Sequence, residues 1–206
     1  MAVNTCMTLT NGICRGCRDN VGGIKKAYFV NACDIDGAGT FTLDTTQGFI
    51  EDYTNSVTWL PFIPTKHTGN YVETINISVE NGTVYYNGVL TLNYTKAEQS
   101  KINTIAELGK GDVAIIFMDG NNKYWWVGGI SVTTTSGIPT AVTADSTNGA
   151  TIGGTSFQTG TAMADANGGS LTFTVDMSHP AMEVRPKSAG KIEGDLATAD
   201  SECSGC

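Results

Sequence analysis

The sequence predicts a mainly β fold: an antiparallel β-sandwich or barrel with one flanking α-helix, at about residues 96–108, and extended termini. At least six short segments have strand character, several of them with apolar residues at every second position. Turn sequences such as Asn81-Gly82 separate them. A single segment has the spacing of an amphipathic helix.

The most regular strand pair is predicted at residues 71–80 and 83–94. Apolar residues occupy alternate positions in the first segment and indicate one buried face: Ile75, Ile77 and Val79. Asn81-Gly82 follows, a dipeptide that readily adopts the positive φ angles of a two-residue hairpin turn. Such a turn would place Val79 opposite Val84 and gather the apolar residues of both strands on the buried face.

The helix is expected directly after this hairpin. Thr95 and Glu98 have the spacing of a capping box, and Gly109 is suited to end the helix. Three apolar residues share one helical face and are expected to pack on the core: Ile102, Ile105 and Ala106.

Further strands are predicted at residues 26–32, 41–44, 57–63, 113–118, 124–130 and 170–177. Residues 113–118 are almost continuously apolar, so this strand should be covered on both faces. The predicted organisation is an N-terminal arm (1–22) with a C-x-x-C pair, a β-sandwich domain (23–186) and a flexible C-terminal tail (187–206) with a second pair. The tail prediction follows from its content of Gly, Ala, Ser and acidic residues.

The composition of the 206-residue chain indicates buried interfaces and an anionic surface. Charged residues make up 16%, against roughly 25% in ordinary soluble domains. Low charge fits either a Thr-rich β protein or, as we expect, a subunit that buries surface in an assembly. The net charge of −8 and the pI near 4.6 argue against a surface that grips nucleic acid. We expect neither a signal peptide nor a membrane span.

The cysteines are the most specific chemical signal. All six lie near the two ends of the sequence, with none at positions 34–202. Cys14 and Cys17 form one C-x-x-C pair, and Cys203 and Cys206 form the other. Together these four have the pairwise spacing of a tetrathiolate zinc site, and we take them as candidate zinc ligands. Disulfides and unpaired thiols are the alternatives.

No signature of catalysis is present in the sequence. The two histidines, His67 and His179, lie in no Ser/His/Asp or Cys/His pattern. No Gly-rich loop leads from a strand into a helix, as a nucleotide site would require. We therefore expect a protein that is not an enzyme and needs no cofactor other than the candidate zinc.

Several segments between residues 23 and 177 form a familiar pattern: the run WLPFIPTK at 59–66, YVETI at 71–75, the turn at 80–83, the helix before Gly109, the strand 113–118, and Gly160 to Ala162 with Asp165 and Gly168. This pattern resembles tailed-bacteriophage tail tube (major tail) proteins and related tail-ring virion proteins. It also resembles virion proteins of phages that infect gut Bacteroidota, the crAss-like phages included.

The resemblance implies a β-sandwich or barrel with one flanking helix, whose copies close side by side into rings that stack around a DNA channel. The expected function is therefore that of a virion structural protein, assembled in the host cytoplasm. Its partners would be other copies of itself and other tail proteins, with DNA only as passing cargo. The acidic excess would suit a lumen that repels DNA. Asp176 and Glu80, on the polar sides of their strands, are the candidate lining carboxylates.

Two other functions fit the sequence. A secreted or surface β-sandwich could bind carbohydrate through a stacking platform of Tyr124, Trp125 and Trp126. Adjacent strand residues point to opposite faces, however, which favours core or interface positions for these aromatics. The second alternative is a small zinc-binding structural protein.

Overall fold

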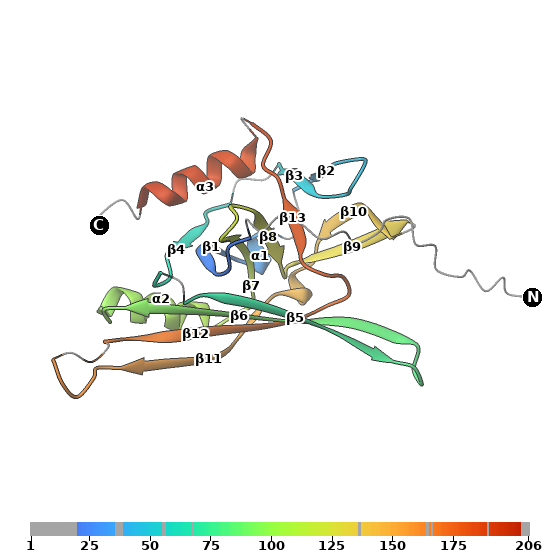
Figure 1. The fold of residues 1–206 in the computed structure, drawn as a ribbon. Helices are drawn as coiled ribbons and strands as arrows, with labels where there is room; N and C mark the ends of the chain where they lie inside the picture. The colour runs from blue at the N-terminus through green and yellow to red at the C-terminus, as the bar shows by residue number, and fades with distance from the viewer. Residues whose placement is uncertain are drawn as a thin grey trace, which may run out of the picture.

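The computed structural model describes residues 20–35, 39–54, 57–66, 68–135, 137–163, 165, 167–188 and 190–202. Strands dominate, and nearly all strand pairs are antiparallel, which confirms the predicted fold class. Two sheets pack face to face, with helices around them (Figure 1). The four-stranded sheet forms the lower layer of this view, and the other elements lie above it.

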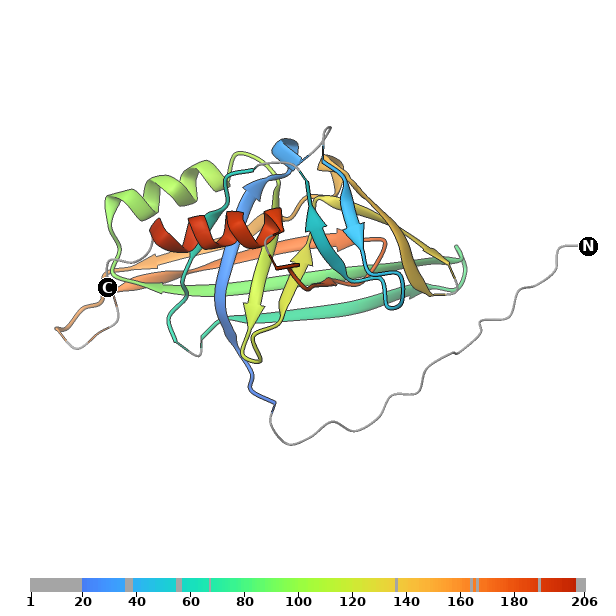
Figure 2. The same ribbon diagram turned by 90° about the horizontal axis from the view of Figure 1, so that it is seen from above.

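The upper layer is a seven-stranded sheet. Its order is β2-β3-β13-β8-β7-β1-β4, and only the β13–β3 pair is parallel. The strands are β1 (Ile24–Asn31), β2 (Phe41–Leu43), β3 (Ile50–Tyr53), β4 (Leu60–Phe62), β7 (Val113–Asp119), β8 (Tyr124–Val127) and β13 (Met182–Val184). A two-stranded sheet of β9 (Ile130–Thr135) and β10 (Ile138–Ala144) extends from it on one side (Figure 2).

The lower layer is a four-stranded antiparallel sheet of longer strands in the order β11-β12-β6-β5. Its members are β5 (Asn70–Ser78), β6 (Thr83–Thr95), β11 (Thr151–Gln158) and β12 (Gly168–Met177). The helices are α1 (Ala32–Ile35), α2 (Gln99–Leu108) and α3 (Lys191–Glu202), with a 3-10 turn at Ser146–Asn148. None of the helices in the described ranges is long and apolar enough to cross a membrane.

The central strands of the upper sheet are buried on both faces. In β1, Phe29 belongs to the core between the sheets, whereas Tyr28 and Val30 belong to a second core on the opposite face. In β7, Ile115 and Ile116 divide in the same way, as the continuous apolar run predicted. Burial of each such side chain contributes about 1.5–3 kcal/mol to the free energy of unfolding.

The core between the sheets joins β1 and β7 to β6 and β12. Phe29 lies with its ring centroid 4.9 Å from that of Phe173. Leu90, Leu92 and Leu171 are completely or almost completely buried around this contact. The alternation of apolar and polar residues in β6 and β12 therefore predicted the buried face of both strands.

The predicted register of the β5–β6 hairpin was wrong by two residues. Ile77 rather than Val79 lies opposite Val84, so the loop has four residues, from Val79 to Gly82. A two-residue turn of the predicted type needs positive φ at both central positions. Here only Gly82 has it (φ 62°), and Asn81 does not. A shift of two positions keeps each side chain on the same face of the sheet, so the predicted face of each residue is correct.

The predicted capping box at the start of α2 does not form. Thr95 is the last residue of β6 and pairs with Gly168, so it cannot cap the helix. The helix begins instead after Glu98, whose side chain makes no capping hydrogen bond and lies 2.7 Å from Lys96 Nζ. The helix packs on the core through Ile105 and Leu108.

The predicted packing face of α2 was only partly right. Ile105 does pack on the core, but Ile102 is 37% exposed and Ala106 is also exposed. The core contact is completed by Leu108, which was not among the residues predicted to pack on the core.

The prediction of a flexible tail after residue 187 was wrong for residues 191–202, which form α3. Ile192, Leu196 and Ala199 recur at helical spacing and are buried in the second core. The Asp52 carboxylate accepts a hydrogen bond of 3.0 Å from the Ile192 amide, and this satisfies one of the free N–H groups at the helix start. Three apolar residues in a polar segment are a weak signal for a packed helix. Only the matching surface of the sheet gives these side chains a partner.

Leu196→Asp should destabilise the protein, because it removes a buried leucine and buries a carboxylate. We expect a loss of about 3 kcal/mol or more in the free energy of unfolding. Ala197→Asp is the matched control, since residue 197 is exposed on the same helix. Urea unfolding of both variants measures the difference. Equal stability of the two would mean that α3 does not pack as described.

Candidate assembly surface

The outer face of the four-stranded sheet is open and lined mainly by hydroxyl and amide side chains. None of the other helices and strands that the structure describes lies on this side of the sheet (Figure 1). The residues that point outward alternate with the core residues in β6 and β12: Tyr85, Asn87, Val89, Thr91, Asn93, Ser170, Thr172, Thr174 and Asp176. In β5 the corresponding positions are Val72, Thr74, Asn76 and Ser78.

This face carries almost no charge. The four strands contain no lysine or arginine and only two acidic residues, Glu73 and Asp176. Glu73 belongs to the side that faces the other sheet, which leaves Asp176 as the charged residue on the outer face of these strands. Its carboxylate accepts a hydrogen bond of 2.8 Å from the Asn87 side chain. The surface therefore offers no cationic group to a polyanion.

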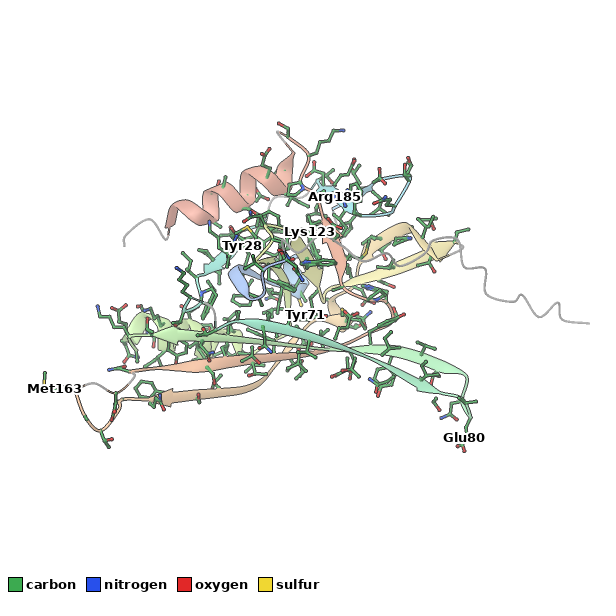
Figure 3. All side chains as sticks on the ribbon, in the orientation of Figure 1. Tyr28, Tyr71, Glu80, Lys123, Met163 and Arg185 are labelled. Atoms are coloured by element: carbon green, nitrogen blue, oxygen red, sulfur yellow. The ribbon has the colours of Figure 1, made fainter. Side chains whose placement is uncertain are left out.

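The candidate channel-lining carboxylates occupy different places. Asp176 lies on the outer face, whereas Glu80 lies in the loop at the tip of the β5–β6 hairpin (Figure 3). The structure thus does not bring the two together. The outer face is hydroxyl-rich, with one acidic residue rather than a band of them.

Both long edges of the sheet are unpaired. β5 and β11 are its outermost strands, and no further strand of the described chain pairs with either. Neither contains lysine or proline, the residues that commonly protect such edges. Unpaired N–H and C=O groups over eight or nine residues form a template for another strand.

The β5–β6 hairpin extends beyond the core that covers the rest of the sheet. Ile75, Ile77 and Val84 lie on the side that continues the buried face, yet they are 57%, 68% and 51% exposed. Val79 in the loop is 90% exposed. The apolar pattern therefore predicted the correct face of the strands, but not that the upper sheet would end before the hairpin does.

A groove of about 490 Å³ opens between the two sheets beside Tyr71, Glu73 and Trp125. The Glu73 carboxylate accepts hydrogen bonds of 2.8 Å from the Tyr71 hydroxyl and from the Ala181 amide. Because Ala181 directly precedes β13, Glu73 connects edge strand β5 to the upper sheet. Burial raises the pKa of Tyr71 strongly, and the hydrogen bond and negative charge of Glu73 add to this.

Tyr124, Trp125 and Trp126 do not form the stacking platform that the carbohydrate-binding alternative would need. Trp126 is fully buried and donates a hydrogen bond of 2.9 Å to the Gly128 carbonyl oxygen. Trp125 lines the groove on the other face of the strand, and Tyr124 packs against the second core. Tyr124 and Trp126 thus share the face of the second core and Trp125 lies on the opposite face, as the alternation of strand residues predicts.

The candidate zinc ligands Cys14, Cys17, Cys203 and Cys206 lie outside the described residues, as does His67. Within the described part of the chain, no group of three or more His, Cys, Asp or Glu side chains could hold a metal ion. His179 is buried, and its ring nitrogens face the carbonyl oxygens of Pro180 (2.8 Å) and Ile130 (3.4 Å). These contacts give it a structural position.

Comparison of the chain with protein-family models, with curated proteins and with solved structures finds no match. The role of the outer face, the free edges and the exposed hairpin must therefore be inferred from their own residues.

Tyr71 should make the stability of the fold sensitive to alkaline pH. An unfolded tyrosine ionises near about pH 10, whereas Tyr71 in the folded protein stays protonated to higher pH. Its contribution to the free energy of unfolding is therefore complete below about pH 10 and is lost as the pH rises above that value. Tyr71→Phe should remove this part of the loss. Melting temperatures at pH 8–11 measure it, with the exposed Tyr85→Phe as a control that should keep the wild-type slope.

Proposed function

We propose that this protein is a non-enzymatic, ring-forming structural subunit of a phage tail, and that the outer face of its four-stranded sheet lines the channel. The observation that carries the proposal is a sheet with two free long edges and an open face that contains no basic residue. Copies of the chain would be its main partners, and the assembled virion its location.

The strand directions support closure through the edges. The sheet has four antiparallel strands, so β5 and β11 run in opposite directions. A rotation axis roughly along the strands preserves strand direction. It therefore sets β5 of one copy antiparallel to β11 of the next, and every joint repeats the pairing used inside the sheet.

The position of the second sheet supports the same arrangement. The upper sheet and α3 lie on the side of the four-stranded sheet opposite to its open face (Figure 1). A ring with the open faces toward the axis leaves these bulky layers outside, where they do not collide. The lumen would then be lined by Thr, Ser and Asn side chains. Such a lining suits DNA that must pass without binding, because it offers no phosphate-binding cations.

The purified protein should form rings, and a charge on the edge strand should prevent them. Val72 is 52% exposed on β5, so Val72→Lys has room and adds a charge of the kind that protects natural edge strands. Thr46→Lys, in the exposed turn between β2 and β3, is the matched control. Native mass spectrometry and negative-stain images should show rings for wild type and control, and monomers for Val72→Lys. A monomeric wild-type protein would refute the proposal.

Lysines on the outer face should convert a surface that does not bind DNA into one that does. We expect Val89→Lys/Thr91→Lys to bind duplex DNA, with affinity that falls steeply as salt rises, whereas wild type binds little. Thr133→Lys/Thr134→Lys on β9, which lies outside this sheet, adds the same charge elsewhere. Fluorescence anisotropy at several salt concentrations measures the three proteins. Strong, salt-sensitive binding by the wild type would contradict a DNA-passing lumen.

A further inference from the structure

The groove between the two sheets is acidic as well as aromatic. The described residues that line its volume of about 490 Å³ include two carboxylates, Glu73 and Asp119, and no lysine, arginine or histidine. Tyr71, Phe117 and Trp125 line it with them, and Figure 3 shows Tyr71 between the two layers. The ring centroids of Tyr71 and Phe117 lie 5.0 Å apart. The groove therefore combines two negative charges with aromatic surface.

Neither carboxylate of the groove pairs with a lysine or arginine of the described residues. Glu73 accepts only the two hydrogen bonds from neutral donors given above. Asp119 accepts hydrogen bonds from backbone amides of its own turn and, at 3.2 Å, from the Trp125 indole. By contrast, Glu98 and Glu183 each contact a lysine or an arginine. Carboxylates withdrawn from water are normally paired with a cation, and the groove lacks one.

The start of the described chain forms one wall of this groove. Residues 20–23 line it and run beside the turn between β7 and β8. The Val21 amide donates a hydrogen bond of 2.8 Å to the Asn121 side chain, which donates one of 2.7 Å to the Asn20 side chain. Gly120 packs so closely on the Val21 carbonyl that a side chain there would collide with it. Asn20 is thereby held at the groove, and the N-terminal arm joins the domain at this point.

The arm that precedes Asn20 contains the missing kind of charge. Arg15 and Arg18 are the basic residues of positions 1–19, in a chain whose net charge is −8. Covalent geometry keeps the Cα atom of Arg18 within about 7 Å of that of Asn20. In an extended chain, residues two positions apart point to the same side, so Arg18 would share the side of Asn20 and Asp19 would point away. So short a tether gives the guanidinium group a high effective concentration at the groove.

A guanidinium group fits the chemistry of the groove. Its planar fork donates parallel hydrogen bonds to a carboxylate, and its face stacks on tyrosine and tryptophan rings. The groove offers both kinds of partner side by side, in Glu73 with Tyr71 and in Asp119 with Trp125. An apolar side chain in the same place would leave both carboxylates without a cation.

From these observations we propose that the groove is the binding site for the N-terminal arm of the same chain, with the Arg18 guanidinium paired to Glu73 and Asp119. The face of the guanidinium lies against Trp125. The arm is thus fixed to the domain next to edge strand β5, and Cys17, which directly precedes Arg18, is held beside the domain. The contact forms within one copy, so it does not depend on the proposed ring.

Trp125 gives a direct report on the groove. The chain has three tryptophans, and the other two, Trp59 and Trp126, are 2% and 0% exposed. Acrylamide therefore quenches mainly the fluorescence of Trp125, which is partly exposed in the groove. A guanidinium group on this ring shields it from the quencher. All proteins in the test are full length and carry Val72→Lys, so that pairing of copies through β5 does not contribute.

Arg18→Gln should raise the acrylamide quenching constant at least about twofold, since a ring that is covered for half of the time or more is free for half of it or less. Arg15→Gln removes the same charge from the same arm and is the matched control, which should keep the parent value. Glu73→Gln keeps an acceptor oxygen for its two hydrogen bonds but loses the charge. It should also raise the quenching constant, and it should add nothing in the Arg18→Gln protein.

Equal quenching in the parent and Arg18→Gln proteins would overturn the proposal, as would an equal rise with Arg15→Gln. A full effect of Glu73→Gln in the Arg18→Gln protein would show that the two groups do not pair. Shielding that appears only at high protein concentration would assign the arm to a second copy and contradict binding within one chain. These outcomes leave the proposed channel untouched, and a protein that forms no rings would leave this measurement unchanged.

Discussion

Burial of β1 and β7 on both faces is the constraint on which the rest of the structure depends. These neighbouring strands supply apolar side chains to two separate cores. Each core needs a layer to cover it: the four-stranded sheet on one side, and α3 with the short strands around it on the other. Because the central strands cannot face water, the chain must place a layer on each side of them.

The four-stranded sheet has longer strands than the central strands that it covers, and this difference creates the exposed surfaces. β6 has 13 residues, whereas the two central strands have eight and seven. The four-stranded sheet therefore projects beyond the core that it covers, and its hairpin carries apolar residues into solvent. These residues continue the pattern of the buried face, but no described layer of the chain reaches far enough to cover them.

The charged residues are also distributed unequally between the two sheets. Every lysine and arginine of the chain lies outside the four strands of the lower sheet. Ion pairs such as Lys123 with Glu183 (3.3 Å) and Arg185 with Glu183 (2.8 Å) lie on the upper sheet and its connections. Neighbouring cations, with the Arg185 hydrogen bond foremost, hold the pKa of Glu183 below its usual range. The lower sheet is left with hydroxyl and amide groups, which interact weakly with anions and cations alike.

The sequence alone determined the mainly β class, the buried face of β6 and β12, and the two-sided burial of β7. Each of these follows from a local period, since side chains alternate along a strand whatever the rest of the chain does. The absence of basic residues from the four strands could also be read from the sequence once their positions were predicted. What it could not show was that these strands form one sheet with an open face.

Only the tertiary structure decided the register of the hairpin, the start of α2, the helical fold of residues 191–202 and the exposure of the hairpin. Thr95 has the right spacing to cap a helix, but its place in the sheet prevents this. Ile192, Leu196 and Ala199 are too few to predict a helix, until Asp52 and the second core provide their partners. Ile75 and Ile77 have the pattern of buried residues, but the opposing sheet does not reach them. Burial depends on where the facing layer ends, and that distance is set by contacts between segments far apart in the sequence.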